Sequence, residues 1–335
     1  MPATATGVQV PVLDADTEQP MTGAVSGFDG ASSVGASTGT AIGVGCALKG
    51  DGTVWCWRSA ASGNSNGSLG NGVIESTGTM LRATQVLVSA NTPLTDVKSI
   101  DPASTCAVTN GGNLYCWGDL TWVVNNGTTL TSGYAQAVTT DGAIPLSGVL
   151  QASVAGGSPC ALLSGTTGKE VWCWGYNGLS NLGTGDTANR HYPTKILGFT
   201  NPTKVVGSFG SNNSLGGHCA IDGANVLCWG YNAQGQCGVG NSNTPVSVPT
   251  LVKLADGTTA FSQAVDLYAG STRICALRDG GTLWCWGSGY QNYAGNLALT
   301  NVVAVGSAPN LQNLTSDGLY HYNTVAISPK CGSLQ

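Results

Sequence analysis

The sequence predicts an all-β protein, a β-propeller of about six four-stranded blades, with seven blades as the alternative. Three observations support this prediction: a repeat with a mean period of about 57 residues, paired cysteines in five of the repeats, and β-prone stretches without helical periodicity. A chain of 335 residues holds close to six such units. Repeated four-stranded units of this length are typical of propellers, so we expect a single domain over residues 1–335.

The centre of each repeat is predicted to be a β-hairpin with a cysteine on each strand. The pairs are Cys46 and Cys56, Cys106 and Cys116, Cys160 and Cys173, Cys219 and Cys228, and Cys275 and Cys285. If the two cysteines of a pair face each other, four of the five connecting loops have two or three residues and contain glycine, as in Gly50-Asp51-Gly52 and Gly223-Ala224. Facing cysteines predict cross-strand disulfides; buried free thiols and zinc ligation are the alternatives.

The remaining strands of each repeat flank the hairpin. A β-prone stretch precedes each first cysteine, at residues 31–44, 97–100, 149–154, 204–209 and 264–268. A glycine-rich loop and a further strand follow the hairpin, for example at residues 84–88 and 248–254. Each complete unit therefore has four predicted strands.

The repeat resembles the regulator of chromosome condensation repeat, whose consensus joins Cys-Ala-Leu, a turn, Cys-Trp-Gly-x-Asn and Gly-Gln-Leu-Gly-x-Gly. The best matches run from Cys173 to Gly185 and from Cys228 to Gly240. The two-cysteine version looks like the form common in secreted bacterial proteins. The resemblance implies a propeller, usually of seven blades. It does not imply one activity, because the family includes a nucleotide-exchange factor and a β-lactamase inhibitor protein.

The composition limits which binding partners and which cellular compartment we expect for this chain. Only 9% of residues are charged, the net charge is −5, and no Lys/Arg-rich run occurs, so nucleic acid is not an expected partner. No apolar stretch is long enough to enter a bilayer as a spanning segment. Residues 1–12 lack the features of a secretory signal, but persistent disulfides form in oxidising compartments. We therefore expect an extracellular or cell-surface location.

Cys237 and Cys331 have no hairpin partner. Cys237 occupies the position of Leu182 and Leu69 in sister repeats, so it is expected to be buried; pairing with Cys331 is a second hypothesis. A further step of 56 residues from Cys275 reaches Cys331, which is expected to open an incomplete sixth unit at residues 322–334. Residues 8–12 resemble its last strand. The favoured hypothesis is that a neighbouring subunit's N-terminal arm, residues 1–20, completes this blade, which would build a polymer.

No catalytic or cofactor motif is found, so we expect a protein that is not an enzyme and binds no cofactor or metal. His191, His218 and His321 match no nucleophile or metal pattern, and His218 is expected to pack between blades. A possible contact surface contains Trp122, Tyr134, Tyr290 and Tyr293, together with Arg190, His191 and Tyr192; local packing or a plain surface loop is the alternative for each.

Three classes of function are compatible with these features. The first is a structural or adhesive protein, such as the subunit or displayed head of a surface filament, whose partner is itself. The second is a soluble secreted binding module, a lectin or an enzyme inhibitor, whose partner is another extracellular protein or a glycan. The third, an enzyme, has no motif to support it.

Overall fold

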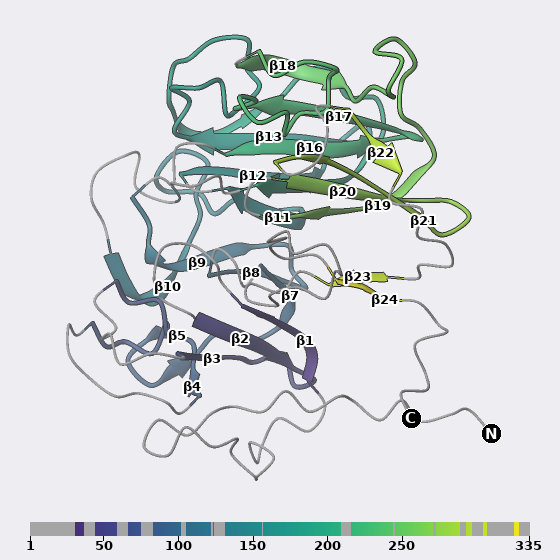
Figure 1. Cartoon of the computed structure of the whole chain (residues 1–335). Coiled ribbons are helices and arrows are strands. Elements are labelled where there is room, and N and C mark those ends of the chain that lie inside the picture. The colour runs from purple at the N-terminus through teal and green to yellow at the C-terminus, as the bar shows by residue number, and fades with distance from the viewer. Residues whose placement is uncertain are drawn as a thin grey trace, which may run out of the picture.

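A computed structural model describes residues 31–36, 44–58, 66–74, 83–101, 105–121, 123, 131–155, 157–208, 216–243, 245–270, 273–288, 293–296, 304–306 and 325–327. These residues form antiparallel sheets that follow one another along the chain (Figure 1). Five of the sheets have four strands each. The all-β propeller is thereby confirmed, with a blade count near six. Within the described ranges, no helix has the length and apolar character needed to cross a membrane.

Each four-stranded sheet uses its strands in sequence order. The strands are β1 (Ala31–Ala36), β2 (Val44–Lys49), β3 (Val54–Arg58) and β4 (Thr84–Gln85); β7 (Val97–Asp101), β8 (Cys106–Thr109), β9 (Leu114–Asp119) and β10 (Thr131–Ala137); β11 (Val149–Ala155), β12 (Ser158–Ser164), β13 (Lys169–Gly175) and β14 (Arg190–Lys195); β15 (Pro202–Ser208), β16 (Gly217–Asp222), β17 (Asn225–Gly230) and β18 (Val246–Leu251); β19 (Ala264–Ala269), β20 (Arg273–Arg278), β21 (Thr282–Gly287) and β22 (Gly295–Asn296). We number these sheets blades 1 to 5.

Two further sheets have two strands each within the described residues. One pairs β5 (Leu87–Ser89) with β6 (Thr92–Pro93), and the other pairs β23 (Ala304–Gly306) with β24 (Val325–Ile327). The β23–β24 sheet follows blade 5 in the chain and is the sixth unit. The first strand of each blade contacts the first strand of a neighbouring blade, as β11 does with β15 and β15 with β19. These first strands are therefore the inner strands, while β4, β10 and β18 lie at the periphery (Figure 1).

The five hairpins have the predicted register. Cys46 pairs with Cys56 and Leu48 with Val54, and Gly52 takes the left-handed conformation with φ of 77° in the three-residue loop. The same cysteine register recurs in the other four hairpins. All five pairs are disulfide-bonded, with Cα–Cα distances of 4.0–4.1 Å. The prediction of a disulfide in the central hairpin of most blades is confirmed.

In blades 2 to 5, the tryptophan of the Cys-Trp-Gly motif enters the hydrophobic core of the preceding blade. Trp117 packs with Leu48 and Val54 of blade 1, and Trp174 with Leu114 and Leu146 of blade 2. Trp229 and Trp286 repeat this arrangement one blade further on. All four side chains are at most 1% exposed. Burial of a large aromatic side chain is a main source of stability, so these tryptophans hold successive blades together.

The sixth unit differs from the prediction. Ala304 pairs with Ile327 and Gly306 with Val325, so its first strand is β23 and lies upstream of residue 322. The prediction that residues 322–334 supply both first strands was wrong because it followed the cysteine spacing, and β23 carries no cysteine. Cys331, the remainder of residues 322–334 and residues 1–20 lie outside the described residues.

Candidate functional site in the channel between the inner strands

The inner strands share an irregularity at one position. Register shifts occur between Val97 and Ser99, between Val149 and Gln151, between Pro202 and Lys204, and between Ala264 and Asp266, and β1 has the same shift between Ala31 and Ser33. A bulge of one residue re-aims the side chains around it. The repeat therefore places Ser33, Ser99, Gln151, Lys204 and Asp266 at equivalent positions around the inner strands.

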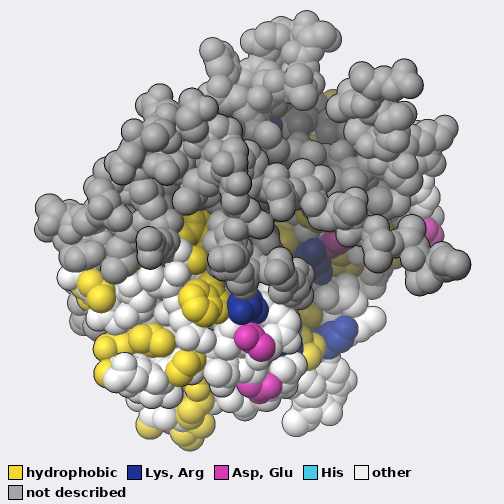
Figure 2. Space-filling view, turned by 90° about the horizontal axis from the view of Figure 1, so that it is seen from below, with side chains coloured by type: hydrophobic (Ala, Val, Ile, Leu, Met, Phe, Trp, Pro, Cys, Tyr) yellow, Lys and Arg dark blue, Asp and Glu magenta, His cyan; other side chains and the backbone are white. Residues whose placement is uncertain are grey.

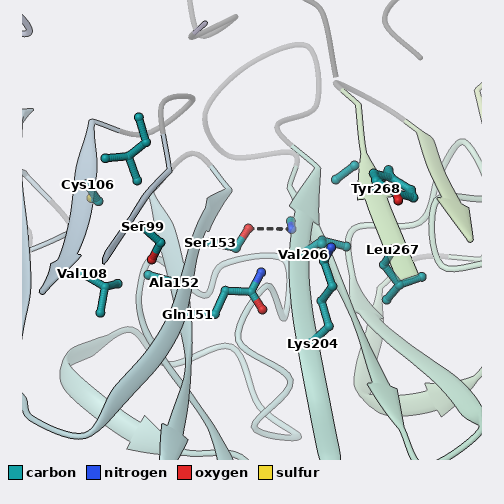
Figure 3. A pocket seen from close by; sticks show the side chains of 13 residues that line it. Ser99, Cys106, Val108, Gln151, Ala152, Ser153, Lys204, Val206, Leu267 and Tyr268 are labelled. Atoms are coloured by element: carbon teal, nitrogen blue, oxygen red, sulfur yellow. Dashed lines mark hydrogen bonds between the residues drawn. The ribbon is translucent and has the colours of Figure 1, made fainter. Parts of the chain in front are cut away.

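A cavity of about 390 Å³ lies among the inner strands of four consecutive blades. Its lining includes Ser99, Gln151, Ser153, Lys204, Leu267 and Tyr268 (Figure 3). The strands that carry these side chains stand beside one another around the cavity, with Gln151 and Ser153 facing β15. This volume falls in the range of small-ligand pockets, and we call it the channel.

Polar side chains of one blade form hydrogen bonds with backbone groups at the edge of the next blade's inner strand. Gln151 Nε2 donates to Val205 O at 3.0 Å, and Gln151 Oε1 accepts from Val205 N at 3.2 Å. Ser153 Oγ accepts from Gly207 N at 2.9 Å, and Lys98 Nζ donates to Val149 O at 2.9 Å. An uncapped edge leaves backbone groups without partners. Several of the polar side chains at the channel thus form hydrogen bonds that connect neighbouring blades.

An ion pair connects blades 4 and 5 across the channel. Lys204 Nζ bonds to Asp266 Oδ1, and the Tyr268 hydroxyl donates to Asp266 Oδ2 at 2.6 Å. The same ammonium lies 5.1 Å from the centre of the Tyr268 ring, a cation–π arrangement. The Lys204 side chain keeps 28% of its surface exposed. Lys204 is therefore held in place while still facing solvent.

The bulged residues themselves directly precede Ser99, Gln151, Lys204 and Asp266 near the start of the inner strands. They are Lys98, Leu150, Thr203 and Val265, and we call them the channel mouth. The inner strands begin here against the hairpin loops of the preceding blades: Val97 N donates to Gly52 O, Val149 N to Gly112 O and Ala264 N to Ala224 O. Leu150 is 37% exposed and Val265 is 56% exposed. Apolar side chains of innermost strands are therefore open to solvent at the mouth.

The predicted contact residues lie away from the channel. Tyr134 and Tyr192 occupy equivalent positions on the outer strands β10 and β14 by their register with β9 and β13. Each packs on a glycine of the preceding blade: a Cβ added to Gly72 would lie 2.7 Å from Tyr134 Cε1, and one added to Gly142 would lie 3.1 Å from the Tyr192 hydroxyl. Local packing thus occupies part of both rings.

The other predicted contact residues are scattered. Arg190 forms an ion pair with Asp186 at 2.7 Å, His191 is exposed, and Tyr293 forms an isolated bridge with Val239. Trp122 and Tyr290 lie outside the described residues. Among the described contact candidates, only Arg190, His191 and Tyr192 come together, because they are consecutive.

His218 and Cys237 are both buried inside the structure. His218 stacks on Trp229 with ring centroids 5.7 Å apart, and its Nδ1 lies 3.2 Å from Asn181 O; burial lowers the pKa of His218 to about 4. Cys237 carries a free thiol in the blade 4 core beside Val226 and Trp286, and burial raises its pKa. Its hypothetical pairing with Cys331 stays a prediction.

Sequence reasoning missed the channel residues. Gln151 and Val205 are 54 residues apart, and nothing in a strand pattern alone shows that one blade caps the next. The available signal was the polar residue near the start of each inner strand, Ser33, Ser99, Gln151, Lys204 and Asp266, within otherwise apolar stretches. Because these five residues occupy the same position in successive repeats, they could have been predicted to lie near one another around the inner strands.

A disulfide-linked propeller with a solvent-open channel is the class that this fold and site define. Residues 170–214 and 224–277 match the model described as the regulator of chromosome condensation (RCC1) repeat, and residues 264–292 match a second model of that description. These parts of the chain therefore match RCC1-type repeats.

Relatives and solved structures agree with this assignment. Mouse Protein RCC2 is 36% identical over 109 residues, covering 32% of this chain and 20% of the relative. The Arabidopsis thaliana RCC1 domain-containing protein RUG3, mitochondrial, is 29% identical over 189 residues, 55% of this chain and 40% of the relative. The chain thus matches less than half the length of these relatives.

The solved structures show the fold. Human WBSCR16 superposes with a TM-score of 0.60 at 18% identity, over 78% of this chain and 67% of that one. Prp20p from Saccharomyces cerevisiae, described with its binding to Gsp1p and histones, gives a TM-score of 0.57 at 16% identity, over 86% and 70% of the two chains.

The predicted extracellular or cell-surface location is wrong in the light of these relatives. RUG3 is mitochondrial by name, and histones, to which Prp20p binds, are proteins of the cell interior. The location had been inferred from the paired cysteines. Facing cysteines follow from the register of the hairpin, and this register belongs to the propeller fold whichever compartment the chain occupies.

Proposed function

We propose that this chain is a non-catalytic protein-binding propeller that engages its partner at the channel mouth. The observation that supports the proposal is the exposure of Leu150 and Val265 on innermost strands, beside a channel with a held lysine. Apolar groups surrounded by polar groups are the usual composition of an interaction surface. The solved relative Prp20p is described as binding proteins, which favours the same class of ligand.

The rigidity of the blades suits this role. Disulfides hold each hairpin, and interblade hydrogen bonds such as Gln151 to Val205 fix neighbouring inner strands. A surface that does not reorganise loses little free energy on binding. The described part of the face in Figure 2 shows mainly hydrophobic and uncharged groups with a few charged side chains, in keeping with the 9% of residues that are charged in the whole chain.

Site-resolved photocrosslinking tests this proposal. Benzoylphenylalanine is placed at residue 150 or 265 of the full chain, and at residue 144 or 197 as controls, because Ile144 and Leu197 are also exposed but lie outside the inner strands. In extract of the source organism, the mouth positions should give discrete protein adducts that unlabelled wild-type chain competes away. Equal adducts from the control positions, or none from the mouth, would contradict the proposal.

Self-assembly is a second candidate. Within the described residues the sixth sheet has two strands where blades 1 to 5 have four, and a strand from another chain can extend a sheet edge. The proposal is that residues 1–20 of one chain complete the last blade of the next. Deleting residues 1–20 should leave folded monomers in sedimentation velocity while the full chain polymerises; equal assembly of both would contradict it.

A further inference from the structure

The inference concerns the ligand chemistry of the channel and rests on the proposed function. The channel is lined by side chains whose hydrogen-bonding capacity is only partly used. What remains unused decides which ligand group the channel accepts, because a buried polar group that lacks a partner costs free energy.

The side-chain acceptor oxygens of Gln151 and Asp266 are already occupied. Gln151 Oε1 accepts from Val205 N. Both carboxylate oxygens of Asp266 are used, one by Lys204 Nζ and Leu267 N and the other by the Tyr268 hydroxyl. A ligand that offers only donors would find these oxygens already engaged.

The donors are in excess. An ammonium group has three N–H bonds, and among the described residues Lys204 Nζ meets one acceptor, Asp266. Ser153 Oγ accepts from Gly207 N, and its hydroxyl hydrogen meets no acceptor among the residues that the structure describes. No hydrogen bond joins the Ser99 hydroxyl to any part of the chain that the structure describes, although Ser99 lines the channel.

The charged side chains nearest to this site carry both signs, with positive charge in excess at the start of the inner strands. The first three positions of the inner strands, within the part of the chain that is described, carry Lys98, Lys204 and Asp266; Asp101 stands at the opposite end of β7. Asp266 pairs with Lys204, and Lys98 Nζ is held by a neutral carbonyl, Val149 O. Among the described first three positions of the inner strands, one positive charge therefore remains without a negative partner.

We infer that the channel binds a carboxylate, presented by an acidic side chain of the partner protein, with Lys204 and the Ser99 and Ser153 hydroxyls as donors and with Leu150 and Val265 contacting apolar neighbours of the acidic residue. Charge-assisted hydrogen bonds from an ammonium are stronger than neutral ones. An acidic residue flanked by apolar residues matches both the donors within the channel and the apolar side chains at its mouth.

Methyl NMR of the full chain tests the inference with defined probes. Acetyl-Leu-Glu-Leu-amide is titrated against acetyl-Leu-Gln-Leu-amide, with the methyl groups of Leu150, Val206, Val265 and Leu267 as reporters. The glutamate peptide should shift these resonances with at least roughly 10-fold higher affinity than the glutamine peptide, a difference of about 1.4 kcal/mol. Equal affinity, or no shift with either peptide, would overturn the inference.

Variants identify the residue that recognises the carboxylate. Lys204→Gln should abolish the preference for glutamate, Lys204→Arg should retain most of it, and Lys195→Gln, which removes an outer-strand lysine paired with Glu170, should leave it unchanged. Unchanged preference in Lys204→Gln would also overturn the inference. Sodium acetate is titrated as a third probe: a response to acetate equal to that of the peptide identifies a small-molecule carboxylate as the ligand and overturns the protein-borne source.

Failure of the inference is distinguishable from failure of the proposed function. If residues 150 and 265 crosslink a partner but the glutamate peptide shows no preference, the channel mouth binds protein without carboxylate recognition. If the peptide binds through Lys204 but no partner crosslinks, the carboxylate site exists and the protein-binding role is wrong.

Discussion

Gly183 lies directly beneath the indole ring of Trp229 in the next blade. A Cβ added to Gly183 would lie 2.7 Å from Trp229 Cδ1, and Gly183 also has a φ of 71°. Gly70 has the same relation to Trp117, and Gly238 to Trp286. The Leu-Gly or Cys-Gly step of one repeat and the Cys-Trp-Gly step of the next are therefore two halves of one interblade contact.

Replacing Gly183 should destabilise the protein more than its backbone conformation alone explains. Gly183→Ala places a methyl group against the ring of Trp229, and we expect a loss of about 2–4 kcal/mol in the free energy of unfolding. The matched control is Gly223→Ala, because Gly223 has a φ of 62° but open space around its Cα; it should cost about 1–2 kcal/mol. Equal losses in denaturant titrations would show that the ring contact contributes nothing.

The amide of Gln151 should contribute to interblade stability. Gln151→Met keeps the length of the side chain but removes both hydrogen bonds to Val205. We expect the free energy of unfolding to fall by about 1–2 kcal/mol. Ser99→Ala changes the equivalent position of blade 2 and should stay within about 0.5 kcal/mol of wild type. The idea of edge capping fails if the two variants unfold at the same denaturant concentration.

His218 should make stability depend on pH below neutrality. Its pKa is about 4 in the folded chain against 6.5 as its ordinary value, so the unfolded chain binds a proton that the folded chain refuses. The stabilisation is complete above pH 6.5 and is lost as pH falls to about 4, an effect of about 3 kcal/mol. His218→Gln should flatten the pH profile in this window, whereas His191→Gln, at an exposed position, should not.

Peptide mapping should separate the cysteines into two groups. Under non-reducing conditions Cys46 should be linked to Cys56, Cys106 to Cys116, Cys160 to Cys173, Cys219 to Cys228, and Cys275 to Cys285. Cys237 should resist alkylation in the native protein and react after unfolding, because burial raises the pKa of its thiol. Links between different repeats, or rapid native labelling of Cys237, would contradict this arrangement.

The hairpins were predictable because all their determinants are local. Cys46 and Cys56 are ten residues apart, and a glycine at the left-handed position of the loop, such as Gly52, sets the register between them. These features need no knowledge of how the blades are arranged in space.

The channel was not predictable by the same means. The bond from Gln151 to Val205 joins residues 54 positions apart, and the bulge before Gln151 appears only when β11 is paired with β12. The sixth unit was misplaced for a related reason: cysteine spacing pointed to Cys331, while the pairing of Gly306 with Val325 depends on β23 and β24. Contacts between distant segments decide both features.

The most direct test of binding at the channel mouth is the affinity of the crosslinked partner for charge-bearing variants. Leu150→Asp and Val265→Asp place a negative charge among the apolar groups at the mouth, and Ile144→Asp and Leu197→Asp do the same at exposed sites elsewhere. By calorimetry, each mouth variant should bind the partner at least roughly 10-fold more weakly than wild type, with the other two unchanged. Wild-type affinity in both mouth variants would contradict binding at the channel mouth.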